Sequence, residues 1–227
     1  MSVGTGSPRH RERGRYELFF ADQACGEERF DVIPTSEGGS VVTGEQTLEA
    51  PHPLAGQQRF RATVSPEGRV LGVEVDWLVG TRALHAQHRA QGGLWHVRID
   101  YAGHVREQEG DYPPSCEVLF GSPLFQTFAL RHYVLAPGAE HEFAALLIGP
   151  PYMAVEPGKQ QVRCTEARML DSPFGPVEAR RVEMLDPAGA DLPVVLWIDA
   201  DERVLESRDG VHDTAPLLLR LVELVTD

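Results

Sequence analysis

The strongest constraint on the fold is an alternation of apolar and polar residues that recurs along most of the chain. In residues 94–101, LWHVRIDY, every second side chain is large and apolar. Turn sequences such as SPEG at 65–68 and the Gly92-Gly93 pair separate segments of this kind about every ten residues. The pattern predicts a mainly β protein built as an antiparallel meander, in which each strand buries one face. We expect about ten to twelve strands in a single large sheet, which must curl because an open sheet of that size does not stay flat.

One segment, Ser122–Leu135, departs from the alternation and has the sequence SPLFQTFALRHYVL. Ser122 is a suitable helix N-cap, and Pro123 is tolerated at the first helical position. Phe125 and Phe128 then recur at helical spacing. The segment predicts one central helix that covers the concave face of the curved sheet, and the whole is an unclosed half-barrel.

The two ends of the chain are less clearly patterned. Residues 1–14 predict a flexible leader with several arginines, and residues 15–227 a single half-barrel domain. The stretch Ala215–Val225 fits a helix or a strand, and we favour a final strand that pairs with Arg203–Arg208.

The overall charge and the cysteine count narrow the class of protein. The net charge of −13 disfavours nucleic acid as a partner, because such a surface repels phosphate backbones. Three scattered cysteines indicate a reducing compartment, and we find neither a signal peptide nor a transmembrane segment, so we expect a cytoplasmic protein. Lys159 is the only lysine and occurs in a turn-like sequence, which disfavours Schiff-base chemistry.

Two pairs of histidines are candidate metal ligands. His85 and His88 are three residues apart, which places them on opposite faces of a strand. His96 and His104 flank a predicted turn and could approach each other, but no third ligand is visible nearby. We therefore predict no metal site and no cofactor.

Two further motifs fall short of a catalytic or calcium site. Ser122 precedes the predicted helix, but the sequence FGSPL lacks the second glycine of a nucleophile elbow, so Ser122 is interpreted as a cap. Asp199 and Asp201 lack the glycine and terminal glutamate of a calcium loop and predict a charged hairpin tip. No catalytic residue is predicted.

A hairpin and the strand that follows it resemble a known group. The residues are SPFGPV at 172–177 with Arg181, followed by LWID at 196–199. Over about Ser122–Arg208 this order resembles the lipoprotein-carrier-like superfamily of half-barrels, which includes LolA/LolB-type carriers, near a bacterial family described as glycolipid-binding. The resemblance implies an unclosed barrel whose concave side holds an acyl chain or a similar ligand.

The functional hypothesis is non-enzymatic binding of an apolar or amphipathic ligand, a lipid or glycolipid, in the cleft between sheet and helix. The expected ligand-binding residues are Phe125, Phe128, His132, Trp77, Trp95 and Trp197. One alternative is a hydrolase or other enzyme that uses His96, His104 or His132 as acid and base. Another is a structural domain that forms a homodimer.

Overall fold

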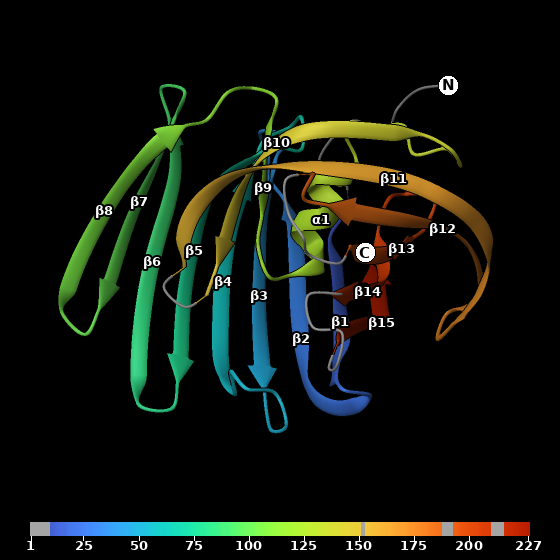
Figure 1. The fold of residues 1–227 in the computed structure, drawn as a ribbon, viewed down its shortest axis with the longest axis horizontal. Helices are drawn as coiled ribbons and strands as arrows, with labels where there is room; N and C mark the ends of the chain where they lie inside the picture. Colours follow the sequence, from blue (N-terminus) through green and yellow to red (C-terminus); the bar gives the residue numbers. More distant parts are fainter. Residues whose placement is uncertain (1–9, 151–152, 188–192, 210–215) are drawn as a thin grey trace.

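The chain forms one continuous sheet with a single short helix in the residues that the computed structural model describes, 10–150, 153–187, 193–209 and 216–227 (Figure 1). The first strands are β1 (Glu12–Phe20), β2 (Gln23–Pro34), β3 (Ser40–Leu48), β4 (Gly56–Val64), β5 (Val70–Val79), β6 (Arg82–Gln91), β7 (Leu94–Tyr101) and β8 (His104–Asp111). The remaining elements are β9 (Cys116–Leu119), helix α1 (Pro123–Leu130), β10 (Glu140–Gly149), β11 (Ala154–Ser172), β12 (Gly175–Leu185), β13 (Val194–Ile198), β14 (Val204–Asp209) and β15 (Leu217–Thr226).

The strand order shows that the two ends of the chain meet inside the sheet. The order runs from β8 back to β1, then to β15, and from β15 back to β9. We call β1–β8 the N-terminal half-sheet and β9–β15 the C-terminal half-sheet. The described part of the sheet has fifteen strands, more than the ten to twelve expected. The terminal strands β8 and β9 are not hydrogen-bonded to each other, which confirms the predicted unclosed sheet.

The predicted antiparallel sheet is confirmed in the described residues, with one parallel pair as the exception. Strand β9 pairs with β10 in parallel, from Cys116 opposite Ala144 to Leu119 opposite Leu147. Helix α1 lies between these two strands in sequence, and parallel neighbours need such a crossover connection.

The sheet curls until its C-terminal half lies over its N-terminal half. In Figure 1, β10 and β11 cross in front of the N-terminal strands, with α1 between the two layers. The side-chain amide of Gln108 on β8 donates to the backbone oxygen of Val155 on β11 at 2.8 Å, so the layers touch. Leu124, Phe125 and Phe128 pack into the larger apolar cluster and Leu130 into the second.

Pairs of glycine and phenylalanine fill the concave side of the N-terminal half-sheet. Gly14 lies opposite Phe30, and Gly44 lies opposite Phe60. A Cβ atom added at Gly44 would lie 2.2 Å from Cε1 of Phe60, so each glycine leaves room for the ring across the strand.

Helix α1 begins where the sequence predicts but ends at Leu130 rather than Leu135. Ser122 is its N-cap and accepts a hydrogen bond from the backbone N–H of Leu124 at 3.3 Å. After Leu130 the chain turns tightly, with the N–H of His132 bonded to the oxygen of Ala129. No helix in the described residues is long and apolar enough to cross a membrane.

The terminal segments join the sheet. The favoured strand at the C-terminal end is confirmed, since β15 pairs with β14 and also with β1. Strand β1 begins at Glu12, so the last residues of the predicted leader are in the sheet, and residues 1–9 lie outside the described residues.

Candidate functional site

The two helix phenylalanines of the predicted cleft are buried. Phe125 is 0% exposed and Phe128 is 2% exposed. The cavity that adjoins Phe128, between α1 and the strands β1, β2 and β15, has a volume of about 10 Å³. That volume holds about one water molecule, so both rings fill the space that α1 covers and leave a ligand no surface there.

Two of the three predicted tryptophans are also enclosed. Trp95 is 0% exposed, and its indole N–H donates to Nδ1 of the buried His88 at 3.4 Å. Trp197 is 7% exposed, and the guanidinium carbon of Arg168 lies 4.3 Å from its ring centroid. Both rings have partners within the protein.

Both ring nitrogens of His132 have hydrogen-bond partners. Its Nδ1 lies 2.7 Å from a carboxylate oxygen of Glu117, and its Nε2 lies 3.0 Å from the backbone oxygen of Glu67. The hydrogen bond with Glu117 raises the pKa of His132, which favours the imidazolium form that can donate to both partners. The ring thus ties the end of α1 to β9 and to the turn before β5.

Trp77 is different, because it is half-buried on the concave face near the open end of β5. It belongs to a line of directly opposed residues on successive strands, which we call the concave row. From β1 to β7 the row is Tyr16, Glu28, Gln46, Gln58, Trp77, Leu84 and Tyr101. It crosses the N-terminal half-sheet from beneath the start of α1 to the half-buried Tyr101 on β7.

The polar end of the concave row is a closed hydrogen-bonded group. Glu28 is 0% exposed and accepts from the hydroxyl of Ser122 at 2.5 Å and from the amide of Gln46 at 3.0 Å. Burial raises the pKa of Glu28 to about 7, although both hydrogen bonds oppose the shift. Ser122 is itself buried and is both cap and partner of Glu28, which confirms its interpretation as a cap.

The other end of the concave row is apolar and partly open. Trp77 and Tyr101 are half-buried and pack against the larger apolar cluster, as do Phe20 and Leu48 near the same end of the sheet. Gln58, next to Trp77 in the row, is 7% exposed and is therefore enclosed. Half-buried aromatic surface that includes a phenol hydroxyl suits a molecule with one apolar and one polar part.

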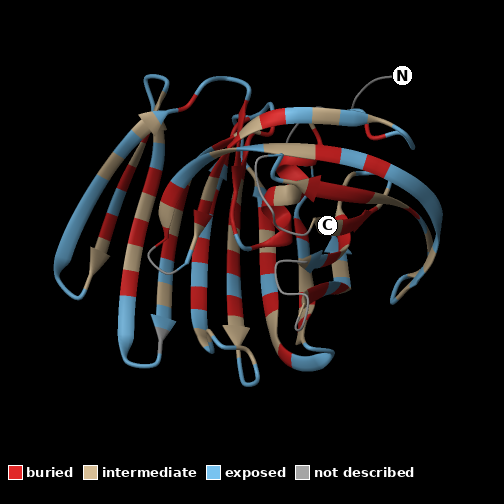
Figure 2. Ribbon diagram, in the orientation of Figure 1, coloured by how far each residue is buried: buried red, intermediate tan, exposed pale blue. Residues whose placement is uncertain are grey.

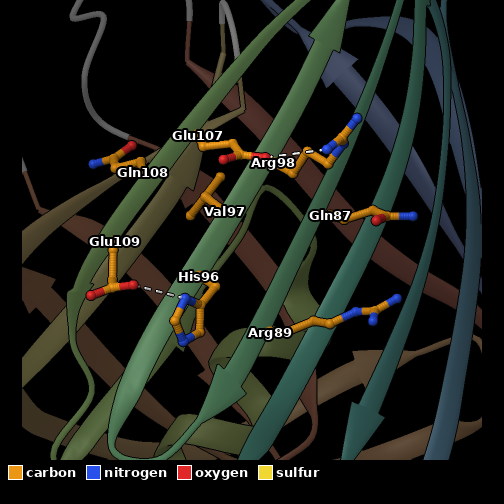
Figure 3. A pocket seen from close by; sticks show the side chains of 8 residues that line it. All are labelled: Gln87, Arg89, His96, Val97, Arg98, Glu107, Gln108 and Glu109. Atoms are coloured by element: carbon orange, nitrogen blue, oxygen red, sulfur yellow. Dashed lines mark hydrogen bonds and ion pairs between the residues drawn. The ribbon is translucent and has the colours of Figure 1, made fainter.

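A hollow of about 440 Å³ lies over β6, β7 and β8 (Figure 3). Most of its lining side chains project from the face opposite to Trp95, and they pair with one another. Arg98 contacts Glu107 at 3.1 Å, and Nδ1 of His96 lies 3.0 Å from Glu109. Arg89 is paired with Glu74 outside the hollow, and the two pairs within it lie on a shallow, exposed surface, so these side chains do not converge on a ligand.

The histidines of the enzyme hypothesis do not come together. His104 lies opposite Tyr101, and His96 opposite Glu109, so the two are five positions apart along the hairpin, or roughly 17 Å. His132 has its own partners on β9 and before β5. His85 and His88 do lie on opposite faces of β6, since His88 is buried and His85 pairs with Asp76 at the surface. In the described residues, no three histidine, cysteine or acidic side chains are grouped to hold a metal ion.

The sequence matches no family model and no curated protein. Solved structures do match the fold. A beta-barrel-like protein of domain of unknown function DUF1849 from Brucella abortus has a TM-score of 0.62 at 9% identity, over 96% of this chain and 98% of that one. A DUF1089 family protein from Pseudomonas aeruginosa has a TM-score of 0.52 at 17% identity, over 82% and 90%. The hypothetical lipoprotein YmcC from Escherichia coli has a TM-score of 0.35 at 10% identity, over 96% and 88%. At these identities the first two similarities establish a shared fold alone.

Proposed function

We propose that the protein binds an amphipathic ligand, a lipid or glycolipid, at the open end of the concave row and performs no chemistry on it. The observation that carries the proposal is the change along that row from buried polar to half-buried aromatic side chains, from Gln46 and Gln58 to Trp77 and Tyr101. The apolar part of the ligand would lie against the half-buried rings of Trp77 and Tyr101. Its polar part would meet the hydroxyl of Tyr101.

This site differs from the cleft that the sequence suggests beneath α1. Phe125, Phe128 and Trp95 are already packed and offer a ligand no surface. Trp77 is the predicted residue that retains accessible surface on the concave face. The resemblance of the hairpin at 172–177 and the strand at 196–199 to half-barrel carriers supports the same class of ligand.

The test begins with native mass spectrometry of the protein purified without detergent, followed by calorimetric titration with lauric acid and with decyl glucoside below its micelle concentration. Trp77→Ala should weaken binding about tenfold or more, because the indole supplies much of the apolar contact area. The matched control is Leu78→Ala. Leu78 is the next residue on β5, is 42% exposed and projects from the opposite face, so its loss should leave binding unchanged.

Two outcomes would contradict the proposal. One is that the wild-type protein carries no ligand and binds neither probe up to its solubility limit. The other is that Trp77→Ala and Leu78→Ala lose affinity equally, since this would place the contact elsewhere.

A further inference from the structure

Glu28 is a buried carboxyl group without a cation beside it. It makes no ion pair in the described part of the chain, and its two oxygens are bonded to the uncharged side chains of Ser122 and Gln46. Glu183 shows the usual arrangement, since it is 9% exposed and pairs with Arg163 at 2.6 Å and with Arg181. An ionised carboxylate in the position of Glu28 must therefore be stabilised by two hydrogen bonds alone.

The groups that face Glu28 from neighbouring elements do not supply a charge. From β1 comes Tyr16, whose hydroxyl donates to the oxygen of Val204 at 2.9 Å and whose pKa burial raises well above 10, so it stays neutral. From β3 comes the amide of Gln46, and from the start of α1 the hydroxyl of Ser122. Further along β1, Glu12 is paired with Arg203 at 2.8 Å.

The start of α1 is poorly equipped to stabilise an anion. Helix N-termini usually offer free backbone N–H groups to a carboxylate. Here the first helical residue is Pro123, which has no N–H, and the next N–H, of Leu124, is used by Ser122. A change in the charge of Glu28 therefore acts on α1 through the hydrogen bond from the Ser122 hydroxyl.

We propose that Glu28 and Ser122 form a pH-sensitive latch that holds the first turn of α1 against β2 and β3 when Glu28 is protonated and loosens it when Glu28 is ionised. Loosening admits water to the carboxylate, which replaces the solvation that the closed site lacks. The latch is a property of the folded chain and does not depend on the proposed ligand.

Linkage sets the size and the sign of the effect. The pKa of Glu28 is about 7 in the closed state, against the ordinary value of 4.5 when the carboxyl is hydrated. A group whose pKa is higher in the closed state favours closing at low pH, and this advantage is lost as the pH rises through 7. The equilibrium constant for opening should rise about 30-fold between pH 5.5 and pH 8.5.

Hydrogen exchange of the wild-type protein tests the latch, with protection factors used so that the intrinsic pH dependence of exchange is removed. Protection of the amides of Leu124 and Phe125 should fall about 30-fold between pH 5.5 and pH 8.5. Glu28→Gln should abolish that fall, because its side chain stays neutral, whereas Glu183→Gln should retain it. Equal protection at the two pH values in the wild type would overturn the proposal, as would a full pH response in Glu28→Gln.

A second measurement decides the matter if Glu28→Gln does not fold. The carbon-13 shift of the Glu28 carboxyl is followed in the wild-type protein over the same range. A midpoint near 7 that coincides with the change in exchange supports the latch. A midpoint near 4.5, or exchange that does not follow the titration, overturns it.

Discussion

The two half-sheets differ in regularity and in what their faces contact. The strands of the N-terminal half-sheet have 8 to 12 residues each and are joined as successive hairpins. Those of the C-terminal half-sheet range from 4 residues in β9 to 19 in β11. Figure 2 shows the contrast at the two ends of the sheet, since β8 is mostly exposed and all four residues of β9 are buried.

One sheet therefore supplies both the concave surface, which is the N-terminal half-sheet, and the elements that cover it, which belong to the C-terminal half-sheet. In β10, Leu146 and Ile148 belong to the larger apolar cluster while Phe143 and Ala145 belong to the second, so both faces of this strand are covered. The N-terminal strands instead bury one face and carry charge pairs on the other. The concave row stays partly open at Trp77 because the C-terminal half-sheet does not cover that end of the N-terminal half-sheet.

The largest expected effect tests whether the side chains of α1 fill the space between the helix and the sheet. Phe125→Ala should lower the free energy of unfolding by about 3–5 kcal/mol, because it removes a fully buried ring from a packed space. Urea denaturation measures the change. The control is Phe174→Ala in the β11–β12 turn, where the side chain is 43% exposed and the cost should stay within about 0.5 kcal/mol. Equal small costs would mean that the space under α1 is not filled.

A moderate effect tests the packing on the concave side of the N-terminal half-sheet. Gly44→Ala should cost about 1–3 kcal/mol, because its new methyl group would meet the ring of Phe60. Gly149→Ala at the end of β10 meets no atom within 4 Å and should be neutral or slightly stabilising. Thermal unfolding of the two variants side by side distinguishes them, and a harmless Gly44→Ala would refute the glycine–phenylalanine pairing.

The smallest effect is expected on the face of the N-terminal half-sheet that is opposite to the concave row. Arg98 and Glu107 form an exposed ion pair there. Arg98→Ala should change the free energy of unfolding by no more than about 0.5 kcal/mol, because exposed pairs are screened and gain little. Denaturation at low and high salt checks this, and a loss of 2 kcal/mol or more would show that the hollow of Figure 3 holds the sheet together.

Local features of the sequence predicted most of the architecture. Alternation identified the strands, and the Ser122-Pro123 pair identified the start of α1, because caps and periodicity act over a few residues. The end of α1 was mispredicted because it depends on distant partners. His132 turns toward Glu117 and the oxygen of Glu67, and nothing in residues 122–135 indicates those contacts.

The candidate site could be predicted only in part, because it depends on register. Alternation shows that Trp77 and Trp95 each face one side of a strand, but not where the covering half-sheet falls. Trp95 lies under it and Trp77 does not. Glu28 and Gln46 carry no motif in the sequence, and only strand pairing places them in line with Trp77.

The pairing of β1 with β15, which joins the two half-sheets, has a consequence for how the sheet assembles. Every other neighbouring pair is joined through a connection far shorter than the stretch of about 200 residues between Phe20 and Leu217. Hairpins can therefore form on each side early, while β1 keeps a bare hydrogen-bonding edge until β15 has been synthesised. During that interval β1 is an additional edge strand that can pair with a foreign chain, and the speed at which β15 pairs with β1 sets how long this edge is open to aggregation.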